Sequence, residues 1–114
     1  MIKSNDLRIG NFVKTFEGGK KKLLSITAKD LMNIDQGSKE VFPVAITKEW
    51  LVKFRFTATE QSFVHFAYTG SHLEQHKDGV YFFSGKIKLN RFPVIYIHQL
   101  QNAFYWLTGE ELSF

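Results

Sequence analysis

A chain of 114 residues is long enough for one domain and too short for two ordinary ones, so we expect a single domain over residues 1–114. Hydrophobic residues make up 44% of it and aromatic residues 16%, a composition that excludes an intrinsically disordered chain. Fifteen Lys and Arg against eleven Asp and Glu give a net charge of +4, which suits an acidic or nucleic-acid partner without specifying either.

The chain contains no cysteine, which excludes disulfides, thiolate zinc sites and cysteine nucleophiles. Charged residues follow Met1 closely, so we expect no signal peptide. No apolar run approaches the roughly 20 residues that span a bilayer. These features predict a cytoplasmic protein that does not engage a membrane.

The first third of the chain predicts a β-hairpin. Residues 11–16 and 20–27 are expected as strands, joined through Glu17-Gly18-Gly19, because glycine tolerates the positive φ of a tight turn. The short apolar run 31–34 is interpreted as a third strand, followed by a polar loop.

In the middle of the chain, Thr47 is a suitable N-cap for a helix that runs to about residue 54. Trp50, Leu51 and Phe54 would share its buried face. Residues 62–69 are expected as a strand covered on both faces, and residues 70–79 as a polar loop.

The last third predicts a second hairpin and a closing helix. Residues 80–83 and 86–89 flank Ser84-Gly85, and one side of this hairpin is expected to face solvent and carry positive charge. From about 96 to 107 the apolar residues recur at intervals of three, four and three, at Ile97, Leu100, Phe104 and Leu107. Gly109 is suited to end this helix in the left-handed conformation.

Together these elements predict an α+β fold. We expect a small, mainly antiparallel sheet of about five to six strands, with a short central helix and an amphipathic C-terminal helix.

The histidines give no clear catalytic or metal site. His72 and His76 are four residues apart, but they lie in the expected loop and lack a third ligand, so we predict no metal and no cofactor. His98 has no paired nucleophile, so we predict no catalytic residue and no enzymatic activity. The polar residues of the final helix are interpreted as a solvated face or a contact surface, at His98, Gln99, Gln101, Asn102 and Tyr105.

Six cations are the candidate partner-binding or nucleic-acid-binding residues: Lys20, Lys21, Lys22, Lys86, Lys88 and Arg91. They would converge, with Lys14, if the two hairpins belong to one sheet, and nearby aromatic rings would then offer stacking surfaces for bases. The alternative is that the lysines only keep a sheet edge soluble. A second possible contact surface is the final helix, at Gln99, Asn102 and Trp106, unless Trp106 packs against the sheet.

Three segments carry a resemblance to a known family. Residues 6–11 read DLRIGN, residues 46–54 resemble the family segment LTEEWLLKFGF, and residues 98–112 resemble HQLQNLYFALTGEEL. Arg55 stands where the family usually has glycine, which predicts a changed turn after the central helix. The family consists of small proteins of bacterial phages, prophages and mobile elements, and it implies a setting in the bacterial host cell without implying catalytic residues.

The resemblance favours a non-enzymatic protein that binds a host protein or ribonucleoprotein. One role that it suggests is an anti-defence inhibitor of the anti-CRISPR type, acting on an RNA-guided nuclease, and this step is an analogy. The alternative is a direct RNA- or DNA-binding accessory protein that uses a basic, aromatic-lined sheet surface. A metal-dependent enzyme at His72 and His76 is the third hypothesis. Oligomeric state is left open by the sequence.

Overall fold

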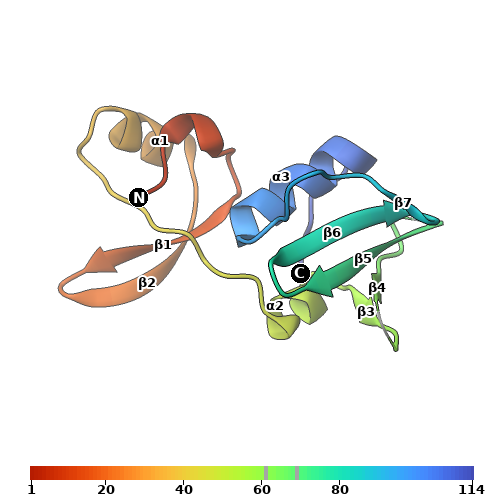
Figure 1. Ribbon diagram of the computed structural model, residues 1–114. Coiled ribbons are helices and arrows are strands. Elements are labelled where there is room, and N and C mark those ends of the chain that lie inside the picture. Colours follow the sequence, from red (N-terminus) through yellow and green to blue (C-terminus); the bar gives the residue numbers. More distant parts are fainter. Residues whose placement is uncertain (61, 69) are drawn as a thin grey trace. The chain divides into compact units, whose positions relative to one another are not determined.

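The computed structural model describes residues 1–60, 62–68 and 70–114. The chain divides into two compact units: unit 1 comprises Met1–Ala45 and Tyr96–Asn102, and unit 2 comprises Ile46–Ile95 and Ala103–Phe114. Mixed helices and antiparallel sheets confirm the predicted α+β class (Figure 1). The expectation of one domain over residues 1–114 stays a prediction.

Unit 1 is built on a two-stranded antiparallel sheet, followed by a helix. Its elements are the 3-10 helix η1 (Ser4–Asp6), β1 (Phe12–Glu17), β2 (Lys20–Ser25), α1 (Ala28–Asp35) and the first part of α3 (Ile97–Thr108). The pairing of β1 with β2 confirms the first predicted hairpin, with Glu17 opposite Lys20 and Phe12 opposite Ser25. Gly18 and Gly19 have φ values of 59° and 78°, which is the type I′ geometry that needs glycine.

The strand predicted at 31–34 is wrong, because these residues belong to α1. A capping box starts the helix: Thr27 Oγ1 accepts from the backbone N–H of Asp30, and Asp30 Oδ2 accepts from the backbone N–H of Thr27. Thr27 three residues before Asp30 was therefore the signal to read. A short apolar run does not by itself distinguish a strand from a turn of helix.

The core of unit 1 is aliphatic. It consists of Ile2, Leu7, Val13, Ile26 and Val41, with Leu24, Leu31 and Ile34 packed against it. Apolar residues from both strands and from α1 therefore share one cluster, which holds the hairpin to the helix of the same unit.

Unit 2 contains a five-stranded antiparallel sheet in the order β3-β4-β5-β6-β7. Its elements are α2 (Lys48–Lys53), β3 (Thr57–Ala58), β4 (Phe63–Val64), β5 (Ser71–His76), β6 (Gly79–Ser84), β7 (Ile87–Lys88) and the second part of α3. Helix α2 confirms the prediction that Thr47 is an N-cap, because its side chain accepts from the backbone N–H of Trp50.

Two sequence interpretations in unit 2 are wrong. The strand predicted at 62–69 is limited to Phe63–Val64, and Thr69 lies outside the described residues. The loop predicted at 70–79 contains β5, a six-residue strand whose Leu73 is fully buried. The polar residues His72, Glu74 and His76 form one face of this strand. Because only the other face is packed on the core, the sequence of the strand is mostly polar and was interpreted as a loop.

The second predicted hairpin is confirmed by the pairing of β6 with β7, where Ser84 lies opposite Ile87. Lys86 therefore sits in the turn. Ile87 and Leu89 are 68% and 42% exposed, so solvent reaches both sides of this strand and not only the lysine side.

The turn after α2 is a Schellman motif. Phe56 N–H donates to Leu51 C=O, and Arg55 N–H donates to Val52 C=O. Arg55 has φ 70°, the left-handed conformation that glycine adopts without strain. The turn thus keeps its left-handed residue although arginine occupies the position.

The core of unit 2 is aromatic. The rings of Phe56, His65 and Tyr68 surround Phe104, at centroid distances of 6.0, 4.9 and 6.3 Å. Phe54, Phe82 and Phe104 are fully buried. Burial of such rings is the largest hydrophobic contribution that a side chain makes, so this cluster should dominate the stability of unit 2.

Helix α3 confirms the closing helix and ends before Gly109, which has φ 75°. Ile97, Leu100 and Phe104 are fully buried as predicted, whereas Leu107 is 42% exposed. Within the described residues, no helix is both long and apolar enough to cross a membrane.

Candidate functional site

The candidate functional site is the basic hairpin, defined here as residues 12–25 of unit 1. It contains four lysines and one glutamate, a net charge of +3 out of +4 for the whole chain. Lys22 Nζ lies 3.3 Å from the Glu17 carboxylate, but both side chains are more than 60% exposed. Exposed pairs contribute little, so this contact leaves the hairpin strongly positive.

The two faces of the basic hairpin differ. Val13 and Thr15 point into unit 1 and are buried. On the opposite face Phe16 and Leu23 are 51% and 48% exposed, and the register places Lys21 directly across from Phe16. This outer face therefore combines solvent-exposed apolar surface with neighbouring lysines, which is typical of interaction surfaces.

The edges of the hairpin differ as well. At the edge of β1 that faces away from β2, Lys14 exchanges two backbone hydrogen bonds with Phe42, of 2.9 and 2.8 Å. The Gln101 side chain from α3 accepts from Phe12 N–H at 2.8 Å and donates to Gly10 C=O at 3.0 Å. In contrast, β2 has β1 as its strand partner in the described chain.

The structure places the six predicted cations in two separate sheets. Lys20, Lys21 and Lys22 belong to the two-stranded sheet, whereas Lys86, Lys88 and Arg91 lie in or beside β7 of the five-stranded sheet. Among the described residues the two hairpins do not share a sheet, so the condition on which the convergence was predicted is wrong. The six cations as binding residues stay a prediction.

The outer face of β5 and β6 also fits base stacking poorly, because its rings are already covered. The His72 ring stacks on Phe83 at 5.1 Å and 3°. Tyr81 is only 7% exposed, since His76 packs edge-on against it and Lys88 Nζ lies 4.5 Å above it. Bases need an open ring face, which this surface does not offer at those residues.

Between its two histidines, Glu74 accepts hydrogen bonds of 2.9 Å from His72 and 3.1 Å from His76. The hydrogen bond from His72 lowers the pKa of the Glu74 carboxyl, against a smaller opposing effect of burial. In the described parts of the chain, no three His, Cys, Asp or Glu residues are grouped so that they could hold a metal ion. The residues make a hydrogen-bonded row along β5.

The other two histidines are buried, and His65 has hydrogen-bond partners for both ring nitrogens. His65 Nε2 lies 3.0 Å from Phe54 C=O, and its Nδ1 accepts from Ala67 N–H at 3.1 Å. His98 is 5% exposed, which overturns its placement on a solvated face. Burial lowers the pKa of both imidazoles, with Asp6 partly opposing this at His98.

Gln101 also overturns the expected solvated face of α3, since it is 2% exposed. Next to the bonds that Gln101 makes with Phe12 and Gly10, two donors share one oxygen of α3. Asn11 Nδ2 donates to Asn102 Oδ1 at 3.0 Å, and Arg8 Nη1 donates to the same oxygen at 3.1 Å. Residues 8–11 and the first part of α3 therefore meet in an amide network within unit 1.

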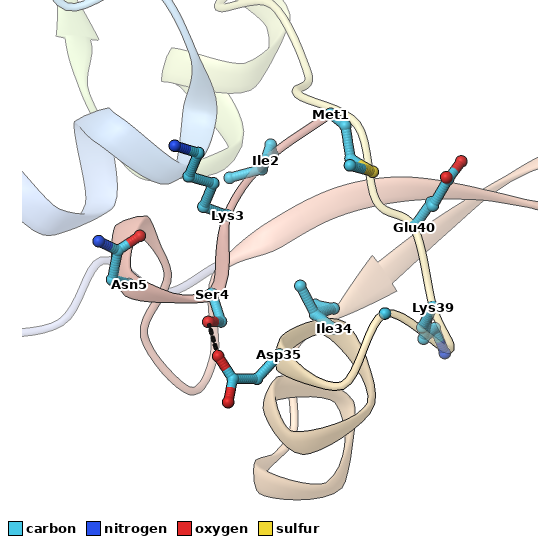
Figure 2. Close-up of a pocket in the computed structure, with 10 residues that line it drawn as sticks. Met1, Ile2, Lys3, Ser4, Asn5, Ile34, Asp35, Lys39 and Glu40 are labelled. Atoms are coloured by element: carbon cyan, nitrogen blue, oxygen red, sulfur yellow. Dashed lines mark hydrogen bonds between the residues drawn. The ribbon is translucent and has the colours of Figure 1, made fainter.

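A pocket of about 460 Å³ lies between the N-terminal residues and the end of α1, all within unit 1 (Figure 2). Ser4 Oγ donates to Asp35 at 3.0 Å across it, and Lys39 is paired with Asp30 at 3.0 Å. Its lining supplies two lysines and two carboxylates, so charge favours no ligand class.

Trp106 is 83% exposed, which excludes the alternative that it packs against the sheet. Gln99 is exposed as well, but Asn102 is engaged in the amide network. Of the second predicted contact surface, Gln99 and Trp106 are therefore the exposed residues.

No protein-family model matches this chain, and no curated protein or solved structure is significantly similar to it.

Sequence reasoning missed Phe16 and Leu23 as members of the candidate site. The signal for Phe16 was present in the sequence. Phe12, Lys14 and Phe16 alternate with Val13 and Thr15, so the period of two places Phe16 on the face of the strand opposite to Val13. What the sequence did not show was which face the rest of unit 1 would cover.

Proposed function

We propose that this chain is a non-enzymatic binding protein that engages a host macromolecule through the basic hairpin. Its setting is the cytoplasm of a bacterial host, where a phage or mobile element supplies it as an inhibitor of a defence system such as an RNA-guided nuclease. The observation that carries the proposal is the concentration of positive charge on one hairpin whose outer face also exposes Phe16 and Leu23.

This combination favours binding for a physical reason. Exposed apolar side chains gain free energy when a partner covers them, at roughly 25 cal/mol per Å² of apolar surface. The lysines around them attract an acidic partner and accelerate its encounter. The phage setting and the defence target rest on the family resemblance and on analogy.

The test is affinity capture from a host with intact defence systems, followed by mass spectrometry and RNA sequencing. We expect the wild-type chain to capture one macromolecule reproducibly. The variant Lys20→Glu, Lys21→Glu, Lys22→Glu should lose it. The matched control Lys86→Glu, Lys88→Glu, Arg91→Glu carries the same charge change in the other sheet and should retain it.

Two results would sink this proposal. One is a wild-type chain that captures nothing under gentle conditions. The other is an equal loss in the two charge variants, which would show that net charge alone governs the interaction.

A direct contact with RNA or DNA is the second candidate, favoured by Phe16, whose half-exposed ring lies opposite Lys21. If three lysines contact phosphates, affinity should fall about 40-fold between roughly 50 and 200 mM salt. A gel shift with single- and double-stranded oligonucleotides measures this. A salt-independent shift, or none, removes the candidate.

A further inference from the structure

The edge of β2 that faces away from β1 indicates how the basic hairpin binds a partner. In an antiparallel pair, residues alternate between those whose backbone groups face the partner strand and those whose groups face away. Lys14 bonds Phe42 on the outer side, so its backbone groups face away from β2. Its register partner Leu23 belongs to the same type of pair, and so do Lys21 and Ser25.

Lys21, Leu23 and Ser25 therefore direct their N–H and C=O groups outward. No backbone hydrogen bond beyond the β1–β2 ladder is made by these three residues with any described part of the chain. Lys21, Leu23 and Ser25 are all exposed. A free edge of this kind is a template for another extended segment.

The side chains along this edge have a direction. Lys20, Lys21 and Lys22 occupy the half next to the turn, and Leu23 and Leu24 occupy the other half. A second copy of the same edge, running antiparallel, would bring lysines close to one another or to leucines, and lysine on an edge strand disfavours such pairing. A segment with carboxylates at one end and apolar residues at the other matches both halves.

We propose that β2 accepts an extended, partly acidic polypeptide segment of a partner protein as a third strand of the β1–β2 sheet. This inference rests on the proposed function and names the partner class and the mode of binding at the same hairpin. Outward backbone groups supply the hydrogen bonds, the three lysines select carboxylates, and Leu23 supplies apolar contact.

Strand addition is favoured over a nucleic acid by the distribution of apolar residues. Leu23 is 48% exposed and aliphatic, so it offers no stacking face, and Phe16 is tied edge-on to Phe42 at 5.4 Å. A nucleic acid would use the lysine side chains and leave the outward backbone groups of β2 unused. That difference provides the readout.

The experiment uses the full chain, amide hydrogen exchange by NMR, and two short capped peptides. One peptide has Glu and Asp in its first half and Val and Thr in its second, and the other has the reverse order, because strands can add in either direction. We expect one of them to slow exchange at the amides of Lys21, Leu23 and Ser25. The amides of Lys22 and Leu24, which face β1, should be protected with and without peptide.

A matched pair of variants isolates the backbone contribution. Leu23→Pro removes one outward N–H and places a ring against the incoming strand, while the fold tolerates proline at a free edge. It should weaken peptide binding at least about tenfold. Leu23→Thr keeps the N–H and removes only the apolar contact, so it should weaken peptide binding clearly less than Leu23→Pro does.

Three outcomes overturn strand addition. The peptides bind but leave Lys21, Leu23 and Ser25 exchanging freely, or neither peptide binds, or a poly(U) oligonucleotide binds in their place. The proposed function fails separately, if the wild-type chain captures no host macromolecule. If Leu23→Pro still captures that macromolecule while the triple-lysine variant does not, the binding function stands and the strand-addition mode is wrong.

Discussion

The cores of the two units are filled by different kinds of residue. Unit 1 has an aliphatic core and a buried amide network at Asn11 and Gln101, whereas unit 2 gathers aromatic rings around Phe104. Helix α3 contributes to both, since residues 97–102 belong to unit 1 and residues 103–108 to unit 2. Apolar packing tolerates small rearrangements, while a buried hydrogen-bond network requires every partner to be present. The units should therefore respond differently to substitution and to pH.

The largest effect is expected from Phe104→Ala in the aromatic core. Phe104 is fully buried among three rings, so its loss should lower the free energy of unfolding by about 3–5 kcal/mol. Urea denaturation measures this. Trp106→Ala removes an even larger side chain two residues later, but at 83% exposure it should change stability by no more than about 0.5 kcal/mol. Equal losses would mean that exposure does not govern this part of α3.

Gln101→Leu tests the amide network of unit 1 at similar volume. It removes the oxygen that accepts from Phe12 N–H and the amide that donates to Gly10 C=O, and we expect a loss of about 2–3 kcal/mol in the free energy of unfolding. Gln75→Leu on β5 is the exposed control and should be nearly neutral. A neutral Gln101→Leu would show that aliphatic packing alone holds α3 to β1 within this unit.

Acid should destabilise both units through their buried histidines. Burial lowers the folded pKa of His65 and of His98 below 6.5, so the unfolded chain binds protons more readily. Their contribution is fully present above about pH 6.5 and is lost as the pH falls toward the folded pKa. Urea denaturation at about pH 7.5 and 5.5 measures the loss.

The control for acid sensitivity is a neutral amide in place of each imidazole. His65→Gln and His98→Gln should each flatten the pH dependence, although both lower stability at neutral pH. His65 should contribute a loss even though both of its nitrogens are hydrogen-bonded, because protonation of Nδ1 removes the acceptor for Ala67 N–H. A pH dependence unchanged in both variants would assign it to carboxylates instead.

The smallest effect is expected at the turn after α2. Arg55→Gly relieves a left-handed arginine and should raise the free energy of unfolding by about 1 kcal/mol, despite loss of the exposed 2.9 Å bond to Phe114 C=O. Lys53→Gly, at the last residue of α2, should lower it by about 1 kcal/mol through helix propensity and loss of the contact of Lys53 with the Trp50 ring. Thermal unfolding of both distinguishes strain from ordinary helix propensity, and a loss in Arg55→Gly would show that the bond to Phe114 outweighs the strain.

Local signals predicted those elements whose cause is local. Gly18-Gly19 predicted the first hairpin, Thr47 predicted α2, and the apolar period predicted α3. The failures share a different cause. Gln101 and His98 were placed on a solvated face or contact surface because periodicity sorts residues by polarity. The burial of Gln101 depends instead on partners from a distant segment, such as Asn11.

The candidate site was half predictable. The triple lysine of the hairpin follows from the sequence, but the placement of Lys86, Lys88 and Arg91 in or beside a different sheet depends on which strands pair. That division is set by long-range pairing, for which a single sequence offers no rule. The free edge of β2 was equally hidden, because it is defined by what occupies β1: Phe42 and the Gln101 side chain.

The Gln101 side chain has a consequence for assembly. Its oxygen accepts from Phe12 and its nitrogen donates to Gly10, the same two bonds that a residue of a neighbouring parallel strand would make, so a helix side chain stands in for a strand. Open-ended stacking of hairpins requires two vacant edges per molecule, one to join and one to extend. With Gly10, Phe12 and Lys14 occupied, β1 offers little room for extension. The basic hairpin therefore has one open edge, at β2, by which it can join another sheet, and a largely occupied edge at β1.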